Sequence, residues 1–352
     1  MTKSKPVAIA LTNGLLDHLD AKTAHGLIRG SDRFQIVGVI DPVHGGKDAG
    51  EVLDGQHRAI PVYHSLVDFN SLSSEKAEFA IIGVALSGGK LPDKWAQLLM
   101  SCMENGLSIV NGLHQPLADN TNFRAAAKKH GVELIDIRKP PGFDQLRFWT
   151  GEIYQVKTPI IAVLGTDCAI GKRTTSRMLT ELCQQNGIQA EMIYTGQTGW
   201  LQGNRYGFIF DATPNDFVCG EIERAIVDCD REESPDLILI EGQSSLRNPS
   251  GPCGSEFILS GNAKTVILQH APFRTYYDEL EGLGCQIPGI EGEIKLISAL
   301  GATTAAVTLN GEGGSEADLL AYQQDLTQKL QIPVIRPLQE GLSDLLPVIG
   351  AV

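Results

Sequence analysis

One stretch constrains the fold of this chain more than any other. The apolar residues 160–164 break at Gly165, and a helical pattern begins at Gly171-Lys172. In such a strand–loop–helix turn the backbone N–H groups and the helix N-terminus face one hollow, and the lysine adds positive charge, so the turn captures anions. The sequence therefore predicts a phosphate-binding loop. Its residues are Gly165, Thr166, Asp167, Cys168, Ala169, Ile170, Gly171, Lys172, Arg173, Thr174 and Thr175.

This loop departs from the common P-loop in two ways. The usual spacer between the glycines is shorter, and a Ser or Thr normally follows the lysine directly. Here Arg173 separates Lys172 from Thr174, which leaves open which hydroxyl, that of Thr174 or Thr175, takes the metal-binding position. The long spacer is similar to that of dethiobiotin synthetase-like P-loop proteins, but the arginine is not. The alternative is a Gly-rich strand-to-helix turn that contains a lysine by chance.

Length and composition indicate a soluble globular protein of two domains. The chain has 352 residues, 42% of them apolar and 20% charged, as in soluble globular proteins. Its net charge of −13 argues against a general nucleic-acid binder, because such proteins carry basic surfaces. No apolar run has the length of a membrane span, and the first residues lack the core of a secretory signal. We expect a cytoplasmic protein with a small-molecule substrate and without a membrane partner, and a homo-oligomer stays open.

The cysteines agree with that location. The chain has seven, scattered and without Cys-x-x-Cys spacing, so reduced thiols fit better than a disulfide framework or a zinc site. Cys168 alone lies in a chemical setting, beside a lysine at a helix N-terminus, that favours a reactive thiolate. The alternative is a small residue that fits the turn.

Residues 1–142 alternate short apolar strands with helical stretches, which predicts a Rossmann-like domain with a parallel sheet. The first turn lacks the G-x-G-x-x-G pattern of dinucleotide-binding domains. Asp41 ends the second strand, where a ribose-binding acid would stand, although Asp41-Pro42 is equally typical of a turn. Residues 87–90, Ser-Gly-Gly-Lys, are either an anion-binding segment or a flexible turn. The expected strands are 7–11, 35–40, 79–84, 107–110 and 132–137.

Residues 143–158 mix aromatic and polar side chains without a period, and we expect a linker. Residues 159–352 then form a P-loop NTPase-like α/β domain. Within it, an apolar strand over 237–241 delivers Glu241, and Mg²⁺ in phosphate chemistry binds through such carboxylates. Thr174 and Glu241 are therefore candidate metal ligands. The alternative is a buried strand that ends in an ordinary acid.

Further candidates follow the strands of the second domain, where ligands of parallel sheets bind. His270, at the end of a strand, and Glu221, in the first turn of a helix, are candidate acids or bases together with Glu241. Arginine suits carboxylate or phosphate groups because its planar fork donates in pairs. The candidate substrate-binding residues are Gln243, Ser244, Arg247 and Arg274.

The combination of an N-terminal α/β domain, the loop with Lys172-Arg173-Thr174 and the strand end Ile240-Glu241-Gly242 resembles one family over almost the whole chain. It is a bacterial two-domain P-loop family, long classed as of unknown function, that includes D-glutamate N-acetyltransferase. The resemblance implies acetyl transfer from acetyl-CoA to the amine of D-glutamate or a similar amino acid. The loop would then hold coenzyme A phosphates without hydrolysis and without Mg²⁺.

Two other functions stay open. In an ATP-dependent ligase or kinase, Lys172 would bind the β- and γ-phosphates of ATP, and Thr174 or Thr175 would bind Mg²⁺ with Glu241. In a non-catalytic nucleotide-binding sensor, the two domains would close on a ligand. Arg173 favours the acetyltransferase, whereas the strand-end carboxylate favours the ligase or kinase.

Overall fold

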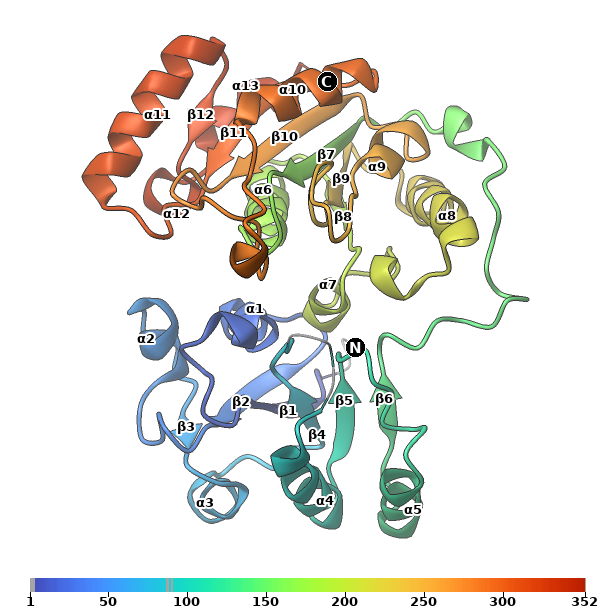
Figure 1. The fold of residues 1–352 in the computed structure, drawn as a ribbon. Coiled ribbons are helices and arrows are strands. Elements are labelled where there is room, and N and C mark those ends of the chain that lie inside the picture. Colours follow the sequence, from blue (N-terminus) through green and yellow to red (C-terminus); the bar gives the residue numbers. More distant parts are fainter. Residues whose placement is uncertain (1–3, 87–88, 90, 352) are drawn as a thin grey trace. The chain divides into compact units, whose positions relative to one another are not determined.

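The computed structural model describes residues 4–86, 89 and 91–351. These residues form two compact units, one made of the chain up to Pro141 with Gln197–Asn204, and the other of Gly142–Gly196 with the chain from Arg205 onward. Each unit is built on one parallel sheet, as the sequence predicts (Figure 1). Of the expected anion-binding segment 87–90, Ser87, Gly88 and Lys90 lie outside the described residues.

The first unit has a six-stranded sheet in the order β3-β2-β1-β4-β5-β6, which is the Rossmann order. The two-residue β3 pairs with β2 at the edge of the sheet. It was not predicted because two residues are too few to show a period. The strands are β1 (Val7–Leu11), β2 (Gln35–Ile40), β3 (Val62–Tyr63), β4 (Phe79–Ile82), β5 (Ser108–Asn111) and β6 (Leu134–Asp136). The helices are α1 (Lys22–Arg29), α2 (Ala49–Asp54), α3 (Leu66–Leu72), α4 (Ala96–Glu104) and α5 (Thr121–His130).

A helix from a distant part of the sequence completes the first unit. Helix α7 (Gln197–Gln202) lies within the sequence of the second domain, yet it packs on α1. Its Leu201 joins Leu27 and Ile81 in the apolar cluster on one face of the sheet, while Ile82 belongs to the cluster on the other face. The side chain of Gln202 donates to the Gly26 carbonyl at 2.8 Å. From the sequence alone we expected these residues in the second domain, because contacts at such a separation leave no local pattern.

The second unit places the P-loop strand at the middle of its sheet, whose order is β12-β11-β10-β7-β9-β8. Side chains alternate along β7, so that Ile161 and Val163 join one apolar cluster and Ala162 and Leu164 the other. The strands are β7 (Ile160–Gly165), β8 (Ala190–Ile193), β9 (Leu237–Glu241), β10 (Thr265–His270), β11 (Thr303–Leu309) and β12 (Val334–Ile335). The helices are α6 (Lys172–Gln185), α8 (Asn215–Glu233), α9 (Ser255–Leu259), α10 (Ile290–Ala299), α11 (Glu316–Leu330), α12 (Pro337–Glu340) and α13 (Leu346–Ile349).

Residues 143–158, expected as a linker, lie along helix α8 of the second unit. The buried carboxylate of Glu223 accepts the Thr150 N–H at 2.6 Å, the Thr150 hydroxyl at 2.9 Å and the Ile153 N–H at 3.1 Å. A side chain at Gly220 would meet the Arg147 carbonyl, since a Cβ there would lie 1.9 Å from that oxygen. Buried carboxylates on α8 therefore hold this segment, and its aromatic composition alone did not show that.

Replacing Glu223 tests this anchor. In Glu223→Gln an amide nitrogen replaces one of the two carboxylate oxygens that accept hydrogen bonds. Buried donors then lose their acceptor, which lowers the local stability by about 2 kcal/mol. We expect backbone amides of residues 150–153 to exchange hydrogen roughly 30-fold faster, measured by mass spectrometry. Asp228→Asn is the matched control, because Asp228 lies on the same helix and has no side-chain hydrogen bond or ion pair within the described residues. Equal exchange in both variants would contradict the assignment.

Candidate functional site

The predicted phosphate-binding loop forms a turn between β7 and α6. Strand β7 ends at Gly165, helix α6 begins at Lys172, and Gly171 before it has a φ of 105°, which favours glycine. A Cβ at Gly165 would lie 2.9 Å from the Lys172 side chain. The two glycines thus let the chain turn and let the lysine fold back over its own loop.

The backbone amides of this loop are available to a ligand. Within the described residues, no hydrogen bond is donated by the backbone N–H groups of residues 167–172. Nearby amides are paired, because Thr166 N–H donates to the Gln269 carbonyl and Thr175 N–H to the Gly171 carbonyl. Consecutive unpaired amides before a helix N-terminus are the donor set that binds phosphate groups.

Lys172 has its ammonium group inside the protein. The residue is only 7% exposed, and its Nζ donates to the carbonyls of Asp167 at 2.5 Å and Ser244 at 2.9 Å. Burial lowers the pKa of Lys172, while the neighbouring Cys168 and Asp167 oppose that effect. Ser244 has a φ of 39°, which is rare outside glycine, and such backbone strain is typical of functional sites.

Asp167 ties the loop to its surroundings. Its fully buried carboxylate accepts hydrogen bonds from Asn248 Nδ2 at 3.3 Å, Arg274 Nη1 at 3.0 Å and the Asp278 N–H at 2.9 Å. Arg274 also donates to the Cys168 carbonyl at 2.8 Å and pairs with Glu312. Asp167 and Arg274 are thus brought to the loop, where they shape it. A substrate carboxylate would have to exchange with partners that Arg274 already has.

Glu241 lies beside the loop, at the end of the strand that pairs with β7. Its carboxylate is 5% exposed and accepts the Thr195 N–H at 3.2 Å. Burial raises the pKa of Glu241, and the positive charge of Arg173 opposes this effect more than any other group. Other P-loops carry the metal-binding hydroxyl at the position after the lysine. Here that position holds Arg173, whose positive charge acts on Glu241.

The two threonines that follow differ in their surroundings. Thr175 is buried, and its hydroxyl donates to Gln269 Oε1 at 2.6 Å. The Thr174 hydroxyl makes no hydrogen bond to any described residue. In the described part of the chain, no group of three or more His, Cys, Asp and Glu side chains is arranged to hold a metal ion.

His270 borders the loop through Thr166. Its Nδ1 lies 2.9 Å from the Thr166 hydroxyl, and its Nε2 lies 3.1 Å from the Tyr322 hydroxyl. Burial lowers the pKa of His270 to about 4, so the ring is neutral near pH 7. Both ring nitrogens are engaged, which makes His270 a support of the loop in this structure.

The remaining candidates have partners of their own. Glu221 accepts the Arg147 N–H at 3.1 Å and pairs with Arg224, away from the loop contacts described above. Arg247 pairs with buried Glu293 at 2.6 Å, and Gln243 Nε2 donates to the Thr195 hydroxyl at 2.9 Å. Ser244, in contrast, does reach Lys172 through its carbonyl. A sequence does not show which partner a charged or polar residue has. It therefore could not separate the candidates that reach the loop from those that pair elsewhere.

Two amide side chains of this site are not among the candidates that the sequence suggests. Gln269, the residue before His270, accepts hydrogen bonds from Thr175 and, at 2.7 Å, from the Thr308 hydroxyl. Asn248 donates to Asp167. The available signal was their place near the carboxyl ends of parallel strands, because Gln269 is the next-to-last residue of β10 and Asn248 lies in the segment after β9.

In the first unit, Asp41 has both oxygens occupied. One accepts the Thr12 hydroxyl at 2.7 Å and the Gly14 N–H at 2.8 Å. The other accepts the N–H groups of Val43 and His44, each at 3.0 Å, and lies 3.0 Å from the His44 ring. Asp41 therefore organises the turns after β1 and β2, and a ribose would have to displace these bonds.

Comparisons with known proteins agree with this architecture. A model described as a domain of unknown function (DUF1611_C), a P-loop domain, matches residues 147–346, and a DUF1611_N Rossmann-like domain matches residues 42–140. The chain belongs to the DUF1611 family. A crystal structure of a DUF1611 family protein from Anabaena variabilis has a TM-score of 0.89 at 25% identity, covering 99% of this chain and all of that one.

Two relatives of this chain carry a functional name. A D-glutamate N-acetyltransferase of a Pseudoalteromonas species is 31% identical over 276 residues, which cover 76% of this chain and 80% of the relative. A protein of the same name from Tritonibacter scottomollicae is 28% identical over 284 residues, covering 78% of this chain and 82% of the relative. The expected two-domain P-loop family is confirmed. Within the described part of the chain, we find no helix that combines the length and the hydropathy of a membrane span.

The buried state of His270 predicts a pH dependence of stability. Between pH 6.5 and about 4 the unfolded chain protonates this histidine whereas the folded one does not, so stability falls as the pH falls through that window. The loss should approach about 3 kcal/mol near pH 4. We expect the free energy of unfolding in urea to fall less steeply with acidification in His270→Asn than in the wild type. Parallel curves would contradict a neutral buried His270.

Proposed function

We propose that this DUF1611 protein is an N-acetyltransferase that moves acetyl from acetyl-CoA to the amino group of D-glutamate or a similar amino acid. The observation that carries the proposal is the similarity to two curated relatives of that name, over more than three quarters of this chain in each case. The geometry of the loop adds physical support.

Coenzyme A suits the loop because it carries a pyrophosphate and a 3′-phosphate. The unpaired amides of residues 167–172 would donate to phosphate oxygens, and Lys172 would exchange a carbonyl partner for one of them. Binding of this kind holds the cofactor without breaking any phosphate bond.

The position of Arg173 favours a site that works without Mg²⁺. In a hydrolytic P-loop, a metal ion stands between the phosphates and the strand-end acid. Here the charge of Arg173 acts on Glu241 more than any other cation does. A resident guanidinium can balance that buried carboxylate and reach a phosphate, as arginine forks do.

Acetyl transfer needs a group that takes a proton from the substrate ammonium. We propose Glu241, since burial raises its pKa and thus increases its proton affinity. The freed amine would attack the thioester carbonyl, the carbon–sulfur bond would break, and the thiolate of coenzyme A would leave and take up a proton. Backbone amides or side-chain amides of the site would stabilise the oxyanion.

One observation favours a second candidate, an ATP- and Mg²⁺-dependent ligase or kinase. Glu241 ends the strand next to the P-loop strand, where such enzymes carry a metal-binding acid. In that function Thr174, whose hydroxyl has no bond to a described residue, would bind the metal ion. A nucleotide sensor would bind the same ligands without turnover.

Turnover of acetyl-CoA with D-glutamate tests the proposal directly. We expect release of the coenzyme A thiol and an N-acetylated product identified by mass spectrometry. Lys172→Ala should lower kcat/KM about tenfold or more, because a charge-assisted bond to phosphate is lost. Lys264→Ala, which removes an exposed lysine of the same unit, is the control. Absence of product with a panel of D- and L-amino acids would remove the acetyltransferase from consideration.

The metal requirement separates the two enzymes. Coenzyme A at one hundred times its Kd should stabilise the wild type by roughly 2.7 kcal/mol in EDTA, measured by thermal unfolding. Arg173→Thr should lose most of this effect, whereas Arg177→Thr on the same helix should keep it. Stabilisation by ATP only in the presence of Mg²⁺, with no response to coenzyme A, would point to the ligase or kinase instead.

A further inference from the structure

The segment that lies along helix α8 carries the exposed aromatic side chains of the described chain. These are Phe143, Phe148, Trp149 and Tyr154, which are 73%, 63%, 40% and 66% exposed. All four belong to the stretch that runs past α8 in Figure 1. Elsewhere in the described residues, aromatic side chains are buried or half-buried. So many exposed rings in one short segment indicate a surface that contacts another molecule.

The exposed rings are grouped. Phe143 and Phe148 both contact the half-buried ring of Phe217 on α8, with ring centroids 5.9 and 4.6 Å apart. Trp149, the residue after Phe148, packs against Tyr154 edge to face, with centroids 5.8 Å apart. We call these five residues the aromatic patch. They all belong to the second unit.

The backbone beneath the aromatic patch is fixed. Glu221 accepts the N–H of residue 147, and Glu223 accepts those of residues 150 and 153. The side chain of Ile153 is fully buried, and Trp149 Nε1 donates to the Ser260 carbonyl at 3.2 Å. A surface that is ordered before a partner arrives loses less conformational entropy on binding. The patch is therefore preorganised for contact.

The patch is large enough for a specific interface. With about 200 Å² for each aromatic side chain, the exposed fractions of its four outer rings correspond to roughly 500 Å². Two copies that packed these rings together would bury about 1,000 Å², the area at which specific interfaces begin. Phe, Trp and Tyr are also the residues that are enriched in the cores of interfaces.

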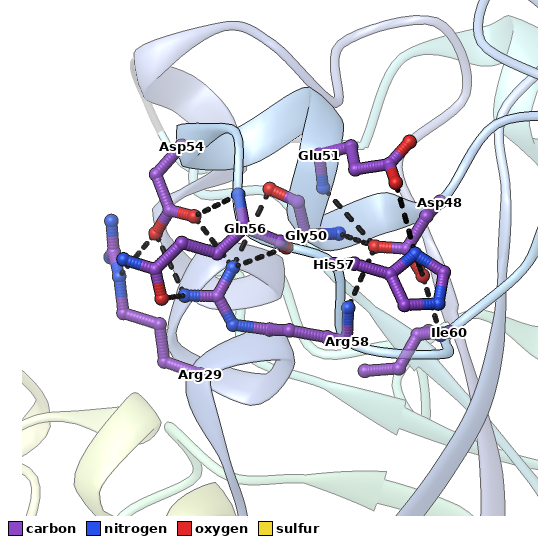
Figure 2. A network of polar contacts seen from close by, with 9 residues as sticks. All are labelled: Arg29, Asp48, Gly50, Glu51, Asp54, Gln56, His57, Arg58 and Ile60. Atoms are coloured by element: carbon purple, nitrogen blue, oxygen red, sulfur yellow. Dashed lines mark hydrogen bonds and ion pairs between the residues drawn. The ribbon is translucent and has the colours of Figure 1, made fainter.

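Two charged side chains between the first rings of the segment lack partners in their own chain. Asp144 and Arg147 are exposed, and neither side chain makes an ion pair or hydrogen bond with a described residue. Opposite charges at similar spacing do pair elsewhere, since Arg58 donates to both carboxylate oxygens of Asp54 at 2.6 and 2.9 Å (Figure 2). Asp144 and Arg147 are thus available to a partner.

A second copy of the chain complements these features. In a two-fold contact, each residue of one copy meets the same counterpart that its own copy offers in return. Asp144 of each copy would pair with Arg147 of the other, so that two ion pairs form at once. Because each chain carries a net charge of −13, two copies repel each other in general. A face on which opposite charges balance avoids that repulsion.

We propose that the aromatic patch is the interface of a homodimer, in which two copies pack their rings across a two-fold axis and exchange Asp144–Arg147 ion pairs. The rings would supply the buried apolar area, and the ion pairs would fix the orientation of the two copies. The dimer does not depend on the proposed function, since no residue of the P-loop takes part.

Sedimentation equilibrium of the full chain tests the interface. We expect the wild type to have twice the 37.9 kDa mass of one chain. Phe148→Ser should raise the dissociation constant of the dimer about tenfold or more, because aromatic anchors dominate interface energies. Leu338→Ser is the matched control, since Leu338 is 70% exposed in the same unit but lies outside the patch. A wild type that stays monomeric at submillimolar concentration would overturn the proposal.

A charge exchange tests the orientation of the two copies. Arg147→Asp and Asp144→Arg each place like charges opposite one another, so each homodimer should weaken about tenfold or more. A mixture of the two variants restores both ion pairs and should form a heterodimer, measured by native mass spectrometry. Both residues are exposed, and thermal unfolding of each variant close to that of the wild type would show that folding is intact.

The outcomes separate this interface from any other. Dimers that Phe148→Ser weakens, and that reform only when the two charge variants are mixed, are the expected result. A wild-type dimer that persists unchanged in both Phe148→Ser and Arg147→Asp would show that another surface joins the copies, which overturns the proposal. Charge variants that do not form a heterodimer on mixing would overturn it as well.

Discussion

A buried ammonium group is the constraint on which the second unit depends. Lys172 cannot stay charged inside the protein unless acceptors surround it, and carbonyls of Asp167 and Ser244 provide them. Asp167 has this position because Asn248, Arg274 and Asp278 hold its carboxylate. Ser244 reaches the ammonium through a left-handed backbone. The loop and the segment after β9 are therefore one structural element, and a ligand that attracts Lys172 acts on both.

In both units, buried carboxylates accept hydrogen bonds from backbone amides. Asp41 and Asp48 organise turns of the first unit, and Glu223 secures residues 150–153 on α8. Each of these carboxylates satisfies N–H groups that regular secondary structure leaves unpaired. Part of the acidic excess of the sequence is thus internal, and net charge by itself overstates how negative the surface is.

The features that could be predicted from the sequence are those with a local physical cause. The P-loop follows from the spacing of Gly165, Gly171 and Lys172 after an apolar strand, and the parallel sheets follow from alternating strands and helices. Features that depend on distant partners were not visible. Leu201 accepts a hydrogen bond from Ser31, which is 170 residues away in sequence, and Glu221 is engaged by Arg147. The same holds for the candidate site residues. Those of the loop could be predicted from local spacing, whereas the roles of single charged residues could not, because a lone charge in the sequence does not identify its counter-ion.

Helix α7 has a consequence for how this architecture can be inherited. The first unit takes Leu201 and Gln202 from a stretch that is encoded inside the second. A gene fragment that ended near residue 142 would leave Leu27 and Phe34 without part of their apolar cover. The two units therefore cannot be separated by a single cut and reused as independent modules, and recombination that shuffles one half without the other should be selected against.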